Sequence, residues 1–198
     1  MSKGMKNETK YDRLNKSKVA IAGLGGLGSN VAVMLARSGV GKLLLIDFDT
    51  VEQGNLNRQH YNTSHLGMLK TEALKRQLEI INPYMELDVR NIKLNQDNIL
   101  ETLKDYELIC EAFDDPVSKA MLVNILLSQD GKKVVAASGM AGLDDANEIK
   151  TKCIFKNLYV CGDFRTDVTE STGMMAPRVM ICAGHQANTI IRLLLGLD

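Results

Sequence analysis

The sequence predicts an α/β fold in which helices cover both faces of a mainly parallel sheet. Apolar runs of strand length alternate with segments of helical period over the first two-thirds of the chain. A glycine-rich turn, G-x-G-x-x-G at Gly23, Gly25 and Gly28, follows the first apolar run and opens a helical segment. Acidic residues end the next apolar run, about 20 residues farther on. These three observations are together typical of a doubly wound, Rossmann-like fold.

The first expected elements surround the glycine turn. A strand over 18–22 leads into a helix over 26–38, which Gly39 ends because glycine tolerates a positive φ. A second strand, over 42–46, is a near-continuous apolar run, as expected for a strand buried on both faces. Residues 48–64 show neither the helical nor the strand period, and a loop of that length is expected to be functional.

The rest of the chain continues the alternation and then departs from it. Ser64 is expected to cap the next helix, which Pro83 stops. The following elements are expected to be strand, helix, strand, helix and strand, over 86–93, 98–103, 107–112, 116–129 and 133–137. Residues 148–155 and 158–161 are expected to add antiparallel strands at one edge, and Pro177 opens a long last helix.

The composition narrows the domain organisation and the partner classes. The 198 residues contain no repeat, linker or low-complexity tract, so we expect one nucleotide-binding domain over 1–198 with a polar arm over 1–17. The formal net charge of zero disfavours nucleic acid as a partner. The start of the chain lacks the apolar core of a signal peptide, and polar side chains interrupt the apolar stretch 179–195. We therefore expect no membrane span and a cytoplasmic location.

The four cysteines do not show the spacing of a metal site. No pair among Cys110, Cys153, Cys161 and Cys182 has C-x-x-C spacing, so no structural zinc is expected. Cys110 and Cys182 lie in apolar runs and are expected to be core residues.

The glycine turn and the acids after it indicate a nucleotide. The backbone can approach an anion where no Cβ intervenes, and a helix N-terminus supplies free N–H groups. Asp47 or Asp49 can accept the ribose hydroxyls, and Asp47, at the strand end, is the natural choice for an NAD enzyme. A tight turn without a ligand and a solvated strand end are the alternatives.

The polar loop after these acids indicates chemistry at a phosphate. Asn55, Arg58 and Gln59 lie just past the ribose position, and Lys70 is expected one turn into the next helix. Arg58 offers a planar fork to phosphate oxygens, and Lys70 adds a point charge. Two cations suit nucleotidyl transfer, in which negative charge develops on the α-phosphoryl group and on the leaving pyrophosphate. The alternative is that both cations belong to a solvated helix face.

A further acid stands where a parallel strand ends. Asp114 follows the strand over 107–112, and carboxyl ends of strands in open α/β sheets bind ligands. A carboxylate there, opposite a triphosphate, can be a Mg²⁺ ligand. Asp115 competes for this role and can equally be the N-cap of the next helix.

Read together, these motifs resemble those of the ThiF/MoeB/HesA family, bacterial relatives of ubiquitin-activating enzymes. The resemblance spans Lys18 to Gly196, and the short chain is most similar to the compact ThiF-like members associated with thiamine biosynthesis. The motifs occur in one order as GLGGLGSN, LLLIDFDTVE, NLNRQ, Lys70, FDD and GMMAPR.

The resemblance implies an ATP-dependent adenylyltransferase that requires Mg²⁺. Such proteins adenylate the C-terminal glycine carboxylate of a small ubiquitin-like sulfur carrier, here ThiS-like and ending in Gly-Gly, and release pyrophosphate. A homodimer is expected, and a sulfur-donor protein is a candidate partner. Two alternatives remain, which are an NAD-dependent oxidoreductase and a catalytically silent nucleotide-binding scaffold.

The resemblance also implies roles for particular residues. Asp49 matches the ribose-binding position, in place of Asp47, and Asp114 matches the magnesium-binding aspartate. The nucleotide-binding turn and the phosphate-contacting positions correspond to Gly23, Gly25, Gly26, Gly28, Asn55, Arg58 and Lys70.

Three features depart from the family pattern. The C-x-x-C pairs of longer members are absent. The irregular segment 162–176, our candidate clamp for the carrier tail, contains Thr169, Ser171 and Thr172 but no cysteine, which does not support a covalent sulfur intermediate there. Arg13 is the only arginine before the first strand, but it lies closer to that strand than the arginine that family dimers supply to the partner's ATP.

Overall fold

The computed structural model describes residues 8–166 and 173–197. Seven strands in these residues form one sheet in the order β3-β2-β1-β4-β5-β7-β6. Every neighbouring pair is parallel except β6 and β7, which confirms the expected antiparallel edge. The strands are β1 (Lys18–Ala22), β2 (Lys42–Asp47), β3 (Glu86–Asn91), β4 (Leu108–Glu111), β5 (Lys133–Ala137), β6 (Lys150–Phe155) and β7 (Leu158–Gly162).

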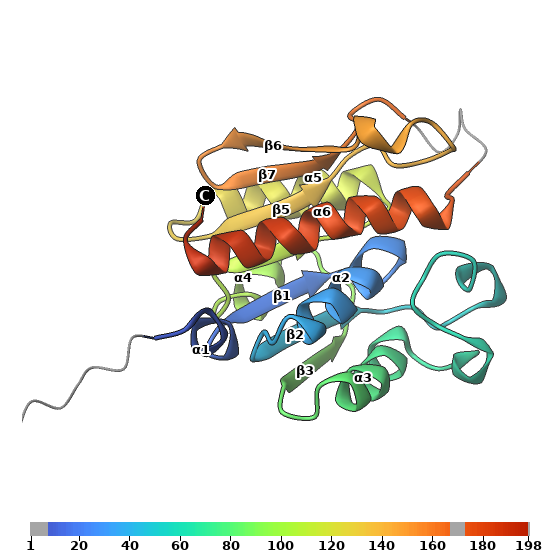
Figure 1. Ribbon diagram of the computed structural model, residues 1–198, viewed down its shortest axis with the longest axis horizontal. Coiled ribbons are helices and arrows are strands. Elements are labelled where there is room, and N and C mark those ends of the chain that lie inside the picture. The colour runs from blue at the N-terminus through green and yellow to red at the C-terminus, as the bar shows by residue number, and fades with distance from the viewer. Residues whose placement is uncertain (1–7, 167–172, 198) are drawn as a thin grey trace, which may run out of the picture.

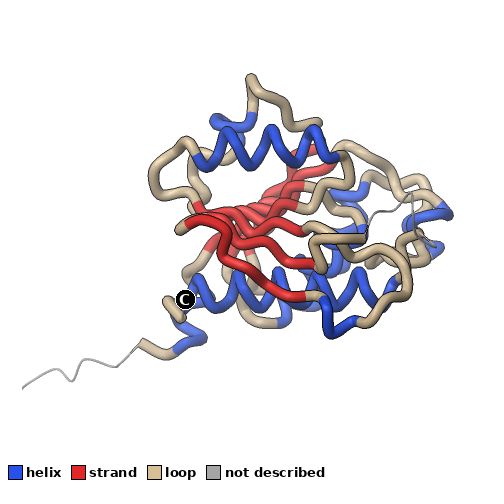
Figure 2. Tube along the Cα trace, turned by 90° about the horizontal axis from the view of Figure 1, so that it is seen from above, coloured by secondary structure: helices blue, strands red, loops and turns tan. Residues whose placement is uncertain are grey.

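Helices cover both faces of this sheet (Figures 1 and 2). Helices α2, α3 and α6 lie on the face toward the viewer of Figure 1, and α4 and α5 lie behind it. The helices are α1 (Lys10–Asn15), α2 (Gly26–Arg37), α3 (Lys70–Ile81), α4 (Ile99–Thr102), α5 (Pro116–Leu127) and α6 (Ala176–Leu195), with 3-10 turns at η1 (Gln53–Asn55), η2 (Thr63–His65) and η3 (Ala146–Glu148).

The two faces of the sheet bury separate hydrophobic cores because side chains alternate along each strand. In β1, Val19 and Ile21 pack into the core beneath α2, α3 and α6. The intervening Ala20 and Ala22 pack into the core beneath α4 and α5. This explains why the inner strands read as continuous apolar runs in the sequence.

The start of α3 differs from the expectation. The helix begins at Lys70, not near Ser64, and Leu69 is its N-cap. Ser64 instead donates its backbone N–H to the side chain of Asn62 in the η2 turn. Gly67 has a left-handed φ of 79°, and Leu69 forms a β-bridge with Thr50, so the chain cannot become helical before Lys70. Lys70 is therefore the first residue of α3.

The expectations for the end of α2, for the cap of α5 and for two of the cysteines are confirmed. Gly39 has a φ of 86° just after α2, and Asp115 caps α5 by accepting from Ser118 N (2.7 Å). Cys110 and Cys182 are fully buried. Among the described residues, no helix combines the length and apolarity needed to cross a bilayer.

Candidate active site

The chain adds β2 and β3 on one side of β1 and then β4 and β5 on the other side, so the order of the strands reverses between β1 and β4. The glycine turn lies at that point. β2 flanks β1 on one side and β4 flanks it on the other, so the carboxyl ends of β1 and β4 border the crevice where doubly wound sheets bind ligands. A Cβ on Gly23 would lie 2.7 Å from the carbonyl oxygen of Ala112, just past β4. A Cβ on Gly28 would lie 1.9 Å from the carbonyl oxygen of Gly23. Only glycine permits this turn.

The two acids after β2 have different tasks. Asp47 is buried, and its carboxylate accepts the N–H of Leu24 in the glycine turn (2.6 Å) and of Asp49 (2.8 Å). Asp49 is half exposed and accepts a hydrogen bond from Lys70 Nζ at 2.8 Å. Asp47 therefore holds the turn against β2, and the carboxylate accessible to a ligand is that of Asp49.

Lys70 is held at the base of the same loop. Its side chain is buried beside Asp49, and its backbone N–H donates to the carbonyl of Asp49 at 2.9 Å. The buried hydroxyl of Tyr61 donates to the carbonyl of Leu24 at 2.9 Å, and it lies 3.5 Å from the carbonyl of Lys70. Tyr61 thus ties the glycine turn to the start of α3, a role that the sequence pattern did not indicate.

Arg58 and Gln59 lie beside the glycine turn. A Cβ on Gly26 would meet the aliphatic stem of Arg58 at 3.5 Å, and one on Gly25 would meet Gln59 Nε2 at 3.8 Å. Among the described residues, the Arg58 guanidinium donates within its own loop, to the carbonyl of Gly54 (3.1 Å) and to the side chain of Asn57 (2.8 Å). Breaking these exposed bonds is inexpensive, so the guanidinium can turn to a phosphate.

The amide oxygens of Gln59 and Asn55, in the same loop, differ in whether they already accept a hydrogen bond. The amide oxygen of Gln59 is buried and has no hydrogen-bond partner among the described residues, so it is an unused acceptor next to the turn. Asn55 is half buried, and its amide oxygen accepts the backbone N–H of Glu52 at 2.9 Å, which folds the η1 turn. Asn55 therefore lies on the loop, with its oxygen already engaged.

At the end of β4 the structure separates three acids. Asp115 is committed to capping α5, which leaves the exposed Asp114 as the carboxylate open to a ligand. Glu111, which sequence reasoning missed, is fully buried, pairs with Lys119 Nζ at 2.6 Å and accepts the N–H of Phe113 at 2.7 Å. Burial raises the pKa of Glu111 against the opposing charge of Lys119. Glu111 shapes the turn that carries Asp114.

The donor set fits Mg²⁺ only with help from a substrate. In the part of the chain that the structure describes, no three His, Cys, Asp or Glu side chains are grouped to hold a metal ion. Mg²⁺ commonly takes one or two carboxylates and completes its shell with phosphate oxygens and water. A single carboxylate at Asp114 fits that pattern.

Other predicted residues lie elsewhere. Arg13 is exposed on α1 and donates to the carbonyl of Leu194 (3.4 Å), at the C-terminal end of α6. It therefore lies away from the glycine turn of its own chain, which adjoins the opposite end of that helix. Thr169, Ser171 and Thr172 lie outside the described residues.

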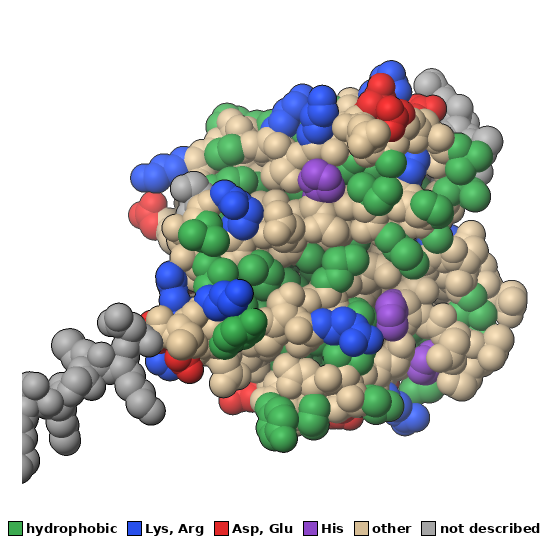
Figure 3. Space-filling model, viewed as in Figure 1, with side chains coloured by type: hydrophobic (Ala, Val, Ile, Leu, Met, Phe, Trp, Pro, Cys, Tyr) green, Lys and Arg blue, Asp and Glu red, His purple; other side chains and the backbone are tan. Residues whose placement is uncertain are grey.

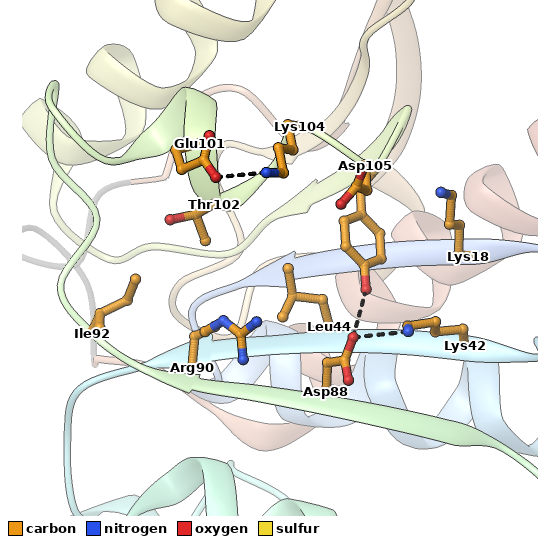
Figure 4. Close-up of a pocket in the computed structure, with 11 residues that line it drawn as sticks. Lys18, Lys42, Leu44, Asp88, Arg90, Ile92, Glu101, Thr102, Lys104 and Asp105 are labelled. Carbon is orange, nitrogen blue, oxygen red and sulfur yellow. Dashed lines mark hydrogen bonds and ion pairs between the residues drawn. The ribbon is translucent and has the colours of Figure 1, made fainter.

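A cavity of ≈ 540 Å³ lies away from this site (Figure 4). Lys18 and Lys42, the first residues of β1 and β2, line it together with Tyr106, Asp88 and Arg90. Asp88 joins Lys42 at 2.9 Å and accepts from the Tyr106 hydroxyl at 3.3 Å. Leu44, Asp88 and Arg90 lie on the sheet face that α4 covers, and no residue of the glycine turn or of the loop that carries Arg58 lines the cavity, so it is separate from the crevice described above.

Comparison with known proteins places this geometry in a family. The "Adenylyltransferase and sulfurtransferase UBA4" of Candida glabrata is 36% identical over 129 residues, which cover 65% of this chain and 30% of that protein. The protein of the same description named MOCS3, from Aedes aegypti, is 36% identical over 111 residues, or 56% of this chain and 25% of that protein. The chain thus spans less than a third of these relatives.

Solved structures share the fold. TcdA of E. coli, a tRNA N6-threonylcarbamoyladenosine dehydratase solved with ATP, superposes with a TM-score of 0.87 at 20% identity, covering 95% of this chain and 89% of that one. E. coli MccB solved with AMPCPP and MccA has a TM-score of 0.76 at 25% identity, covering 96% and 59%. The ThiF family matches residues 3–198, and the chain belongs to the ThiF family.

Proposed function

We propose that this protein is an adenylyltransferase that uses ATP to activate the C-terminal glycine carboxylate of a small ubiquitin-like sulfur carrier. The observation that carries the proposal is the placement of Arg58 beside the glycine turn, with the Asp49–Lys70 pair and Asp114 bordering the same crevice. Membership of the ThiF family and the resemblance to UBA4 support it. The resemblance of its motifs to those of ThiF-like members favours a ThiS-like carrier ending in Gly-Gly, in the synthesis of the thiamine thiazole.

The reaction makes few chemical demands on the protein. The carrier's terminal carboxylate is already anionic at neutral pH, so it attacks the α-phosphorus of ATP without a general base. A bond forms between a carboxylate oxygen and that phosphorus, the bond to the bridging oxygen breaks, and pyrophosphate leaves with the electron pair. Catalysis then consists of positioning the two reactants and neutralising the charge that develops.

Named side chains divide these tasks. The N–H groups of the glycine turn bind the phosphates, Asp49 accepts the ribose hydroxyls, and Asn55 supports the loop that carries Arg58. Arg58 and Lys70 stabilise the charge on the α-phosphoryl group and on pyrophosphate. Asp114 would hold Mg²⁺, which when bound neutralises phosphate charge.

A hydride-transfer enzyme that uses NAD is the competing function. Its cofactor would occupy the same glycine turn and the same acid, but hydride transfer gives no task to Arg58, Lys70 or Asp114. Titrations with ATP and with NADH separate the two functions, because binding of NADH without binding of ATP would reverse the proposal.

The decisive test is ATP–pyrophosphate exchange with and without a carrier that ends in Gly-Gly. We expect exchange that depends on the carrier and falls about 100-fold or more in Arg58→Ala and Asp114→Ala, since each removes a group that meets developing charge. Matched controls are Arg90→Ala and Asp105→Ala, whose side chains line the separate cavity. Equal losses in the controls, or exchange without a carrier, would contradict the proposal.

We also propose that the protein forms a homodimer through the face that α6 and α2 share. Apolar side chains gather across this face (Figure 3). In the sequence of α6, Met180 and Ile181 are exposed. Contiguous exposed apolar patches mark interaction sites. Sedimentation should show a dimer that Ile181→Asp dissociates, while Ile80→Asp, at an exposed apolar position of α3, leaves it intact. A monomeric native protein would refute this.

A further inference from the structure

We infer that the buried ion pair between Asp163 and Arg178 positions the side of the active site that receives the carrier's carboxylate. It sets the first turn of α6 and two loops against the glycine turn. This rests on the proposed function, because it assigns the pair to positioning the attacking carboxylate and leaves ATP binding to other residues.

Asp163 is the centre of a buried hydrogen-bond network just after β7. Its carboxylate receives the N–H groups of Arg165 and Thr166, both at 2.9 Å, and the Thr166 hydroxyl at 2.8 Å. Its own N–H donates to the carbonyl of Gly139 at 2.9 Å, which joins the loop after β7 to the loop after β5. A Cβ on Gly139 would lie 2.1 Å from the Asp163 carboxylate, so the two loops fit only with glycine there.

Arg178 extends the network to α6. Its side chain is 3% exposed, and its guanidinium donates to the Asp163 carboxylate and to the carbonyl of Asp145, the latter at 3.0 Å. Its Nε has no partner among the described residues. Burying two charges costs desolvation energy that their attraction barely repays, so such a pair contributes little net stability and is better explained by fixing one arrangement of the chain.

The arrangement that the pair fixes adjoins the glycine turn. Val179, next to Arg178, packs against Gly26 of the glycine turn, where an added Cβ would lie 3.0 Å from Val179 Cγ1. Gly142 of the loop after β5 donates to the carbonyl of Gly173, just before α6, at 2.8 Å. The protein groups predicted to bind phosphate lie on α2, on α3 and on the loop between β2 and α3. Neither member of the pair contacts them in the described structure. A change in the pair should therefore displace the first turn of α6 and the two loops more than it displaces the groups predicted to bind phosphate.

The test compares Asp163→Asn and Arg178→Lys with Arg165→Ala, an exposed arginine on the same loop that pairs with Asp144 and Glu148. Arg178→Lys keeps the charge and is the milder variant. Direct titration gives the Kd for ATP, pyrophosphate exchange gives the KM and kcat for a carrier ending in Gly-Gly, and hydrogen exchange follows the amides of residues 165 and 166. All measurements are made below the melting temperature of each variant.

We expect the kcat/KM for the carrier to fall about 10- to 100-fold in both variants, the scale of a displacement of about 1 Å between reactants. The Kd for ATP should stay within twofold, the amides of residues 165 and 166 should exchange faster, and Arg165→Ala should behave as the native protein. If native exchange depends on the carrier but the variants lose ATP binding and turnover equally, or lose neither, the inference is wrong. A native protein without carrier-dependent exchange overturns the proposed function, and this inference with it.

Discussion

Replacing Gly28 by alanine tests whether close packing of α2 on β1 shapes the nucleotide site. The new Cβ would lie 1.9 Å from the carbonyl oxygen of Gly23, about 1.1 Å inside the 3.0 Å limit that real Cβ atoms respect. The obstacle is backbone, so helix and strand must separate. Overpacking of this severity costs about 3 kcal/mol, and alanine returns about 1 kcal/mol as a better helix former. The net cost of roughly 2 kcal/mol lowers Tm by roughly 4 to 8 °C in a chain of this size.

Gly184 provides a control because it is also a glycine within a helix. A Cβ there meets no atom of its own chain within 4 Å. Because Gly184 lies one turn from Ile181, both glycine variants are compared in the Ile181→Asp background, where Gly184→Ala should raise Tm by about 1 to 4 °C. Urea denaturation gives both free energies of unfolding, and ATP titration should show that only Gly28→Ala weakens nucleotide binding. A Gly28→Ala protein as stable as Gly184→Ala, with native ATP affinity, would refute the argument from backbone contact.

Three further predictions address other parts of the structure. Asp47→Ala should cost about 2 to 4 kcal/mol in urea denaturation, because one buried and one partly buried N–H group lose their acceptor. Asp49→Asn should cost less, because asparagine keeps an acceptor for the buried Lys70 Nζ, yet it should weaken ATP binding about tenfold. Burial would raise the pKa of Asp163, but hydrogen bonds from Thr166 and Arg165 and the charge of Arg178 lower it overall. The ionised Asp163 carboxylate should therefore stabilise the fold above the usual Asp pKa, and this stabilisation should be lost as the pH falls through the lowered pKa of Asp163. Below a pH of about 4, the urea midpoint of Asp163→Asn should then depend less on pH than that of the native protein. With a thiol reagent, Cys153 should react quickly and the buried thiols only on unfolding, since burial raises the pKa of Cys110, Cys161 and Cys182; fast reaction of more than one thiol in the native protein would contradict the described burial.

The outcome at the acidic end of β2 shows where sequence reasoning stopped. Spacing placed both Asp47 and Asp49 near a ribose, and only the family resemblance favoured Asp49. The structure separates them by burial, because Asp47 accepts two backbone N–H groups and Asp49 remains half exposed. Similarly, Ser64 had the chemistry of a helix cap, but the bridge between Thr50 and Leu69 held the chain extended and delayed α3 to Lys70.

The sequence by itself determined the order of strands and helices, the glycine turn and the loop that carries Arg58. These features depend on local period and on backbone conformations that particular residues permit, so neighbouring residues suffice to predict them. Only the tertiary structure decided the roles of Tyr61, Glu111 and the Asp163–Arg178 pair. Their tasks depend on partners brought together by folding, as when Gln186 of α6 donates to the carbonyl of Glu111 at 3.0 Å, 75 residues away.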